Sequence, residues 1–193
     1  MFETLRKHVN SQLEMSDEEF RLGTTFLTPK KLRKRQYLLQ SGEVCKWIVF
    51  IEKGCLRLYS LDDFGAERIL GFGIEGWWMS DLESFQTRKP ATRNLDALED
   101  SELLIIGLES LEKVSAASPK WDRYFREVLD REYNAAISRI SDFIGGSAEE
   151  RYLRFLSLYP DLFQRIPLHQ IASYLGITPQ SLSRIRKDLA ARK

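Results

Sequence analysis

Three glycines between residues 69 and 78 have the spacing of a dinucleotide-binding motif. Gly71, Gly73 and Gly76 form G-x-G-x-x-G within ILGFGIEGWW. In an enzyme that binds a dinucleotide, this motif joins a strand to a helix, whose N-terminus binds the pyrophosphate. Here EGWWMSDLESF is followed by the breaker RKPATRN and another apolar run. We therefore reject a nicotinamide enzyme and assign the glycines to bends and close backbone approach between antiparallel strands.

The residues needed for a metal or nucleophilic active site are missing or scattered. His8 and His169 lie near opposite ends of the chain, and residues 36–108 contain no histidine. A metal-dependent jelly-roll enzyme would instead collect histidines and a carboxylate from neighbouring strands. Cys45 and Cys55 lie in apolar stretches, which favours small buried thiols over a disulfide. The sequence predicts no catalytic site, no metal and no cofactor.

The C-terminal segment has the pattern of a helix-turn-helix. Residues 165–193 contain six basic residues and one acid, a local charge of +5, which is typical of a segment that binds a polyanion. In PLHQIASYLGITPQSLSRIRKDLA we expect a short helix, a turn at Gly176 and a second helix that begins at Pro179 and is capped by Thr178. The expected inward positions of the short helix are Leu168, Ile171, Ala172 and Leu175.

The second helix is predicted to present hydrogen-bonding side chains on one face. At 100° per residue, the inward positions are Leu182, Ile185 and Leu189, and the outward positions are Gln180, Arg184, Lys187 and Ala191. Arg can bind guanine through two hydrogen bonds, Gln can bind adenine, and Lys can neutralise a phosphate. Hydroxyl groups near the helix N-terminus come from Thr178, Ser181 and Ser183. The pattern favours DNA binding over a solvated helical hairpin.

The rest of the chain divides by hydrophobic period. Helical spacing extends to about residue 28, with a capping box at Ser16 and Glu19. Residues 36–108 alternate with a period of two, in runs such as WIVFI, CLRLYSL, ERILGF and ELLIIGL, with a hairpin expected at Asp62 to Gly65. The expected fold class is α+β, with an N-terminal β region followed by helices.

A long helix is expected over residues 121–144, ended by Gly145 and Gly146. One seam of this helix follows steps of four and three through Phe125, Leu129, Glu132, Ala136, Ile140 and Phe143. Apolar or aromatic residues also occur beside the seam at Tyr124, Val128, Tyr133, Ile137 and Ile144. The pattern favours pairing with a second copy across a homodimer over packing on the β region of the same chain.

Composition is that of an ordinary globular protein. The 193 residues are 43% hydrophobic and carry a formal net charge of +1. No run approaches the roughly 18 apolar residues of a membrane span, and MFETLRKHVN lacks the apolar stretch of a secretion signal. We expect one large or two small domains, a cytoplasmic location and no membrane partner.

The order of these elements resembles the Crp/Fnr superfamily of bacterial transcriptional regulators. The segments that carry the resemblance are EKGCLRLYSLDDFGAERILGFGIEGWW and IASYLGITPQSLSRIRKDL. The resemblance implies a double-stranded, jelly-roll-like β-roll of the cyclic-nucleotide-binding type over residues 1–117, a dimerisation helix over 118–145 and a helix-turn-helix DNA-binding domain over 146–193. It also implies a near-palindromic operator and RNA polymerase as a candidate partner. The alternative is a ligand-binding roll whose terminal helices bind a protein partner.

The sequence departs from the family pattern at several positions. Pro179 occupies the base-reading slot where the best-known members have an arginine, while Gln180 and Arg184 fill the other slots. No cysteine cluster for an iron-sulfur centre is present, and we expect no hairpin wing after the second helix.

The effector pocket implied by the resemblance is also altered. Its candidate residues are Gly76, Trp77, Asp81, Arg88, Ala91 and Arg93. Asp81 fits the acidic slot, but alanine stands at position 91, where the family binds the cyclic phosphate. The bulky Trp77 and Trp78 are expected to occupy part of the purine space. A cyclic nucleotide is therefore disfavoured as a ligand.

Overall fold

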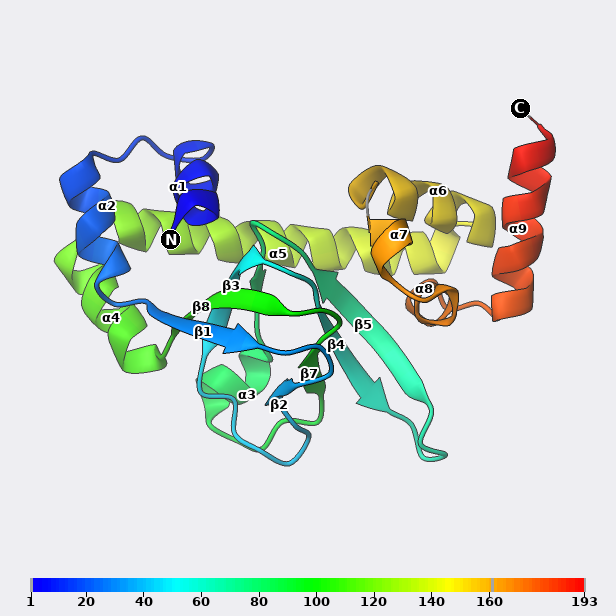
Figure 1. The fold of residues 1–193 in the computed structure, drawn as a ribbon, viewed down its shortest axis with the longest axis horizontal. Coiled ribbons are helices and arrows are strands. Elements are labelled where there is room, and N and C mark those ends of the chain that lie inside the picture. Colours follow the sequence, from blue (N-terminus) through cyan, green and yellow to red (C-terminus); the bar gives the residue numbers. More distant parts are fainter. Residues whose placement is uncertain (1, 161, 193) are drawn as a thin grey trace. The chain divides into compact units, whose positions relative to one another are not determined.

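The computed structural model describes residues 2–160 and 162–192 (Figure 1). Their contacts divide the chain into two compact units. The first comprises Met1–Ser60 and Gly71–Arg131, and the second comprises Leu61–Leu70 and Glu132–Lys193. Helix α5 (Pro119–Gly145) contributes residues to both units. The domain limits expected from the sequence, after residues 117 and 145, remain a prediction.

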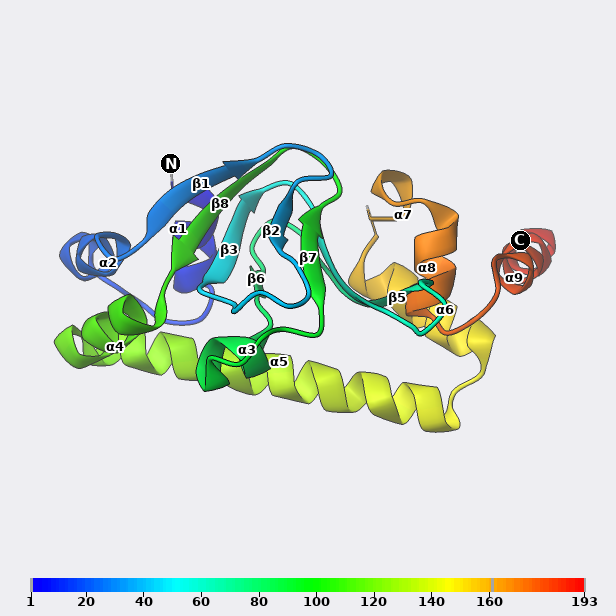
Figure 2. The same cartoon turned by 90° about the horizontal axis from the view of Figure 1, so that it is seen from below.

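The strands form a β-roll of two four-stranded sheets, with strand orders β1-β8-β3-β6 and β2-β7-β4-β5 (Figures 1 and 2). Most of the roll lies in the first unit, whereas the end of β4 and the start of β5 belong to the second. Antiparallel pairing joins β1 to β8, β8 to β3, β3 to β6, β2 to β7, and β7 to β4. The strands are β1 (Thr28–Leu32), β2 (Tyr37–Leu39), β3 (Ile48–Lys53), β4 (Leu56–Leu61), β5 (Glu67–Gly73), β6 (Trp78–Met79), β7 (Asn94–Ala97) and β8 (Ser101–Ile106). The predicted α+β fold with an N-terminal double-stranded roll is confirmed.

Helices accompany the roll in the first unit. They are α1 (Glu3–Asn10), α2 (Asp17–Thr24), α3 (Leu82–Thr87), α4 (Leu108–Ala117) and the N-terminal part of α5. The predicted capping box begins α2, since the Ser16 amide donates to the Glu19 carboxylate at 2.8 Å and the Glu19 amide donates to Ser16 Oγ at 3.2 Å. The Leu5 amide at the N-terminus of α1 donates to Glu52 Oε1 on β3 at 2.9 Å, which ties this helix to the first sheet.

Two apolar cores lie on opposite faces of the first sheet. Val49 and Ile51 belong to the core between the two sheets, whereas Phe50, between them on β3, belongs to the core formed with α1, α4 and α5. Because both faces of this sheet are covered, β3 and β8 are apolar at consecutive positions. Aromatic side chains dominate the helix-facing core, namely Phe50, Trp78, Trp121, Tyr124 and Phe125.

The G-x-G-x-x-G segment follows strand β5 into a turn. A Cβ at Gly73 would lie only 2.2 Å from Met79 Sδ, so a side chain at this position would require the Met79 side chain to move. Gly76 has a φ of +85° in the turn before β6, and its amide donates to the Ile51 carbonyl at 2.9 Å. No helix begins directly after Gly76, which argues against a dinucleotide motif, and the close approach at Gly73 and the turn at Gly76 agree with the interpretation of these two glycines.

Cys45 and Cys55 are both buried as thiols, as predicted. Within residues 2–160 and 162–192, no three His, Cys, Asp or Glu side chains are grouped as a metal site would require. None of the helices in this described part of the chain is long and apolar enough to cross a lipid bilayer.

The second unit consists of helices and the tip of the β4–β5 hairpin. Its helices are the C-terminal part of α5, α6 (Ala148–Leu158), α7 (Leu162–Arg165), α8 (Leu168–Tyr174) and α9 (Pro179–Ala191). The hairpin turns at Gly65, whose φ is +79°, as predicted. A compact apolar core holds the helices together and includes Tyr152, Phe155, Tyr159, Leu162, Ile166, Ile171, Ala172, Leu175 and Leu182.

Candidate nucleic-acid interface and sensor site

Helices α8 and α9 form the predicted helix-turn-helix. The turn contains Gly176, whose φ is +66°, and a Cβ at this position would lie 2.7 Å from the Phe143 ring. Thr178 caps α9, because its Oγ1 accepts a hydrogen bond from the Ser181 amide at 3.1 Å. Pro179 occupies the first turn, where a missing N–H is tolerated. The geometry thus follows from the residue types at the turn.

Burial separates the two faces of α9. Leu182 is buried and Ile185 and Leu189 are half-buried, as expected for the inward face. The exposed residues include all four predicted outward positions, Gln180, Arg184, Lys187 and Ala191, together with Thr178, Pro179 and Ser183, whereas Ser181 is half-buried. On α8, Ile171, Ala172 and Leu175 are buried, but Leu168 is 37% exposed. Leu168, the first residue of α8, is therefore less completely buried than the other predicted inward residues.

Some basic side chains of the C-terminal segment form intramolecular contacts. The Arg186 guanidinium lies 4.5 Å from the centre of the Phe163 ring, and Arg192 forms an ion pair with Glu149. Within the described residues, neither Arg184 nor Lys187 has an ion-pair partner. These two side chains therefore remain available to a phosphate or a base edge.

The β4–β5 hairpin is joined to α8 by hydrogen bonds that sequence reasoning did not anticipate. The Ile69 amide donates to Ser173 Oγ at 3.1 Å, and that hydroxyl donates to the Glu67 carbonyl at 2.9 Å. Arg139 on α5 donates to the Leu70 carbonyl at 2.6 Å. A serine and an arginine bonded to main-chain groups carry no pattern in the sequence, so no signal identified this junction.

Helix α5 presents an exposed apolar stripe in the second unit. The side chains of Tyr133, Ile137, Ile140 and Ile144 are 67%, 48%, 54% and 83% exposed, respectively. They recur at steps of four, three and four, so they share one face of the helix. Large apolar side chains left open on one helix face are typical of an interaction surface.

The exposed stripe is rotated from the predicted seam. Phe125 is 8% exposed and packs edge-on against Trp78, 5.4 Å between ring centres, so its own chain already covers it. Phe143 is 44% exposed, but its ring lies beneath Arg151 and beside Gly176. Ala136 is half-buried, and Leu129 is 40% exposed. Of the residues predicted for a dimer contact, Leu129, Ala136 and Ile140 lie on or beside the exposed stripe.

Two of the candidate effector residues in the first unit, Asp81 and Arg93, form an ion pair with each other. Asp81 is 2% exposed and caps α3, accepting from the Ser84 amide at 3.1 Å. Its Oδ1 also accepts from Arg93 Nη1 at 3.1 Å, which neutralises the acid within the protein. Asp81 Oδ2 is buried and has no hydrogen-bond partner among the described residues. Arg93 also lies 3.5 Å from Glu83.

The remaining pocket candidates differ in their surroundings. Ala91 is 4% exposed and offers no side-chain donor. Arg88 ends α3 with a φ of 60° and lies over the Phe85 ring. Gly76 and Trp77 are half-buried in the turn before β6. Trp78 is 6% exposed in the core that faces α5, and its indole donates to Tyr124 Oη at 2.9 Å. The expectation that Trp78 occupies purine space is wrong, because β6 directs its side chain toward the helices.

A partly buried hydrogen-bond network connects α1 to this helix-facing core. His8 Nδ1 lies 2.8 Å from the Tyr124 hydroxyl, and His8 Nε2 lies 2.8 Å from Gln12 Nε2. Burial, together with the nearby positive charge of Arg131, lowers the pKa of His8 to about 4. His8 is therefore neutral in the folded protein at ordinary pH.

Comparison with known proteins agrees with this architecture. Residues 29–118 match the family model of the cyclic nucleotide-binding domain. The chain is 26% identical over 168 residues to the transcriptional activator protein FnrA of Stutzerimonas stutzeri, with 81% of this chain and 68% of that protein covered. It is also 26% identical over 199 residues to the fumarate and nitrate reduction regulatory protein of Yersinia pestis, with 94% and 73% covered.

Solved structures share the fold. FixK2 from Bradyrhizobium japonicum superimposes with a TM-score of 0.72 at 21% identity, covering 86% of this chain and 85% of that chain. The catabolite activator protein of Thermus thermophilus gives a TM-score of 0.59 at 20% identity, covering 96% and 87%. Relatives that match most of this chain, from the roll to the terminal helices, are named as regulators of transcription. By these comparisons the chain is similar to transcriptional regulators of the Crp/Fnr superfamily.

Proposed function

We propose that the protein acts as a homodimer that binds a specific DNA sequence through α9 and has no catalytic activity. The observation that carries this proposal is the exposed face of α9, where Gln180, Arg184 and Lys187 point away from the buried Leu182. In this proposal Arg184 and Gln180 bind base edges in the major groove, and Lys187 neutralises a phosphate. Thr178, Ser181 and Ser183 contribute hydroxyl groups at the phosphate-facing N-terminus of the helix, and Pro179 occupies the remaining base-reading slot.

The exposed stripe of α5 supports the dimeric part of the proposal. One recognition helix covers only a few base pairs, so a regulator gains affinity and specificity by presenting two. Tyr133, Ile137, Ile140 and Ile144 would be covered by the same residues of a second copy. The operator would then be near-palindromic, with half-sites about 34 Å apart. We propose RNA polymerase as a further partner and the cytoplasm as the location, since DNA and polymerase meet there in bacteria.

We further propose that cyclic AMP and cyclic GMP are not its effectors. A buried cyclic phosphate needs a positive charge and paired donors, and Ala91 supplies neither. Arg93, the nearest alternative cation, is already bonded to Asp81. Asp81 Oδ2 could accept from a ligand hydroxyl, but that contact alone leaves the phosphate without a partner.

Selection from a random duplex library tests the function directly. The full chain should enrich one near-palindromic sequence, and Arg184→Ala should relax the preference at one base position in each half-site, since a bidentate contact contributes about 1 to 3 kcal/mol of discrimination. Arg186→Ala is the matched control, because Arg186 lies on the same helix but stacks on Phe163. If the full chain enriches no sequence, the terminal helices serve a protein partner instead, and the proposal is wrong.

A further inference from the structure

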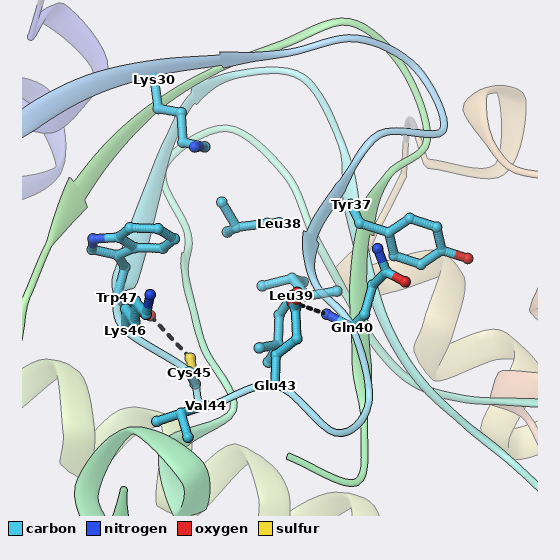
Figure 3. A pocket seen from close by; sticks show the side chains of 11 residues that line it. Lys30, Tyr37, Leu38, Leu39, Gln40, Glu43, Val44, Cys45, Lys46 and Trp47 are labelled. Atoms are coloured by element: carbon cyan, nitrogen blue, oxygen red, sulfur yellow. Dashed lines mark hydrogen bonds between the residues drawn. The ribbon is translucent and has the colours of Figure 1, made fainter. Parts of the chain in front are cut away.

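The β-roll has a cavity at its open side, apart from the candidate nucleotide residues. Strands β1 and β2 are the edge strands of the two sheets, and the cavity of about 540 Å³ is lined by residues of both (Figure 3). Its wall continues through residues 43–47, which lead into β3, and through Leu95 on β7. Ordinary small-molecule sites measure about 300 to 1,000 Å³, so the cavity has room for a ligand.

The base of the cavity is apolar, whereas its lining also includes Lys30, Gln40, Glu43 and Lys46. Leu39 and Leu95 form part of its buried base, with 4% and 1% exposure. The side chains of Leu38, Val44 and Trp47 are half-buried and lie along its walls (Figure 3). A flat indole and branched aliphatic groups left partly uncovered favour a ligand with an apolar, planar body.

Lysines at the rim make the cavity attractive to an anion. Lys30 Nζ lies 5.1 Å from the centre of the Trp47 ring, and Lys46 is exposed beside it. Within the described residues, neither lysine has an ion-pair partner. The acid at the rim, Glu43, instead accepts from the Gln40 amide at 2.9 Å. The adjoining residues 30–35, KKLRKR, contain five basic residues and no acid, which raises the local positive potential.

We propose that this cavity binds a small organic carboxylate with an aromatic body. The ring would lie against Trp47 and Leu38, and the carboxylate would pair with Lys30 at the opening. A lysine ammonium is a point charge that suits a monoanion, whereas a phosphate is usually held by arginine forks or several backbone amides, and no arginine lines the cavity. Asp81, Ala91 and Arg93 do not line it either, so the cavity is separate from these candidate nucleotide-binding residues.

Titration calorimetry on the full chain tests the charge requirement, with phenylpropionate as the probe and its neutral amide, phenylpropionamide, as the uncharged match. Saturable binding of the carboxylate is expected, with the amide about tenfold weaker, because it loses the charge-assisted contact. Lys30→Gln should weaken carboxylate binding about tenfold. Lys31→Gln is the matched control, since the Lys31 side chain is 80% exposed and pairs with Glu102, and its effect should stay below about twofold.

Indole NMR resonances locate the ligand. The chain has four tryptophans, and the resonance lost in Trp47→Phe identifies Trp47. Only this resonance should shift with phenylpropionate. The proposal is overturned if no saturable binding occurs by about 10 mM, if the amide binds as tightly as the carboxylate, or if Lys30→Gln and Lys31→Gln behave alike. It is equally overturned if the resonances of Trp77 or Trp78 shift while that of Trp47 stays in place.

Discussion

Replacing Ile140 by glutamate should dissociate the protein into monomers. Ile140 lies in the middle of the exposed stripe of α5 and is 54% exposed in the single chain. Full burial of an isoleucine side chain is favourable by about 1.5 to 3 kcal/mol, so covering the exposed half contributes roughly 1 to 1.5 kcal/mol per chain. Because a symmetric dimer buries Ile140 of both copies, the burial free energy doubles to about 2 to 3 kcal/mol, which corresponds to a factor of roughly 30 to 150 in the dissociation constant.

The glutamate adds a second penalty. Its charge would have to lose water to enter an apolar contact, and the symmetric copy would bring a like charge beside it. We therefore expect the dimer dissociation constant of Ile140→Glu to rise by at least about 100-fold, and that of Ile144→Glu to rise comparably, because Ile144 is 83% exposed.

Sedimentation equilibrium measures this effect. Asn134→Glu is the matched control, since it adds the same charge to an exposed, polar position of α5 outside the stripe and should leave the dimer intact. Circular dichroism confirms that each variant keeps its helices. The reasoning is refuted if the unmodified protein is a monomer at micromolar concentration, or if Ile140→Glu dimerises as tightly as Asn134→Glu.

Three further perturbations test other parts of the structure. Millimolar cyclic AMP or cyclic GMP should leave the midpoint of thermal unfolding unchanged. Micromolar affinity would instead add about 4 kcal/mol to the free energy of unfolding and raise the midpoint by several degrees. Such a rise, if Asp81→Ala abolished it, would refute the view that Ala91 prevents nucleotide binding. Ser173→Ala should remove both hydrogen bonds that join the hairpin to α8, each of which contributes about 1 kcal/mol. Hydrogen exchange of the Ile69 amide should then be at least about tenfold faster. Ser183→Ala is the control at an exposed serine, and unchanged exchange in Ser173→Ala would contradict the role of the Ser173 hydroxyl. The pKa of His8 is about 4 in the folded protein and about 6.5 when unfolded, so between these pH values the unfolded state binds the extra proton and stability falls as pH falls. Allowing for partial exposure of His8, the free energy of unfolding should drop by about 1 kcal/mol from pH 7 to pH 5. Urea titrations of His8→Gln should lack this drop, and an equal drop in the variant would contradict the assignment to His8.

Local chemistry made the helix-turn-helix predictable from the sequence. Thr178 caps α9 and Gly176 adopts a positive φ. Few other residue types can cap a helix or adopt a positive φ at a low cost in free energy, so these two residues are informative in the sequence. The two periods of hydrophobicity likewise separated the roll from the helices. They did not predict that the first sheet is covered on both faces, which makes β3 apolar at consecutive positions.

Tertiary contacts made other features unpredictable. Phe125 and Phe143 match the seam of α5 by spacing, yet Trp78 and Arg151 of the same chain contact them. The exposed stripe is therefore rotated from the predicted seam toward Tyr133 and Ile137. Residue spacing shows which side chains share a helix face, but it does not show whether other parts of the chain already cover that face. The bond between Arg93 and Asp81 was also unforeseen, since it depends on how the turn after α3 folds back.

The most direct measurement of the central claim is the dependence of DNA affinity on half-site spacing. Fluorescence anisotropy would compare the selected operator with a duplex that carries about five extra base pairs between the half-sites, which turns one half-site to the opposite side of the helix. A dimer that presents two α9 helices should bind the altered duplex at least about 100-fold more weakly, close to its affinity for one half-site, at the same salt concentration. Equal affinity for both duplexes would contradict the account.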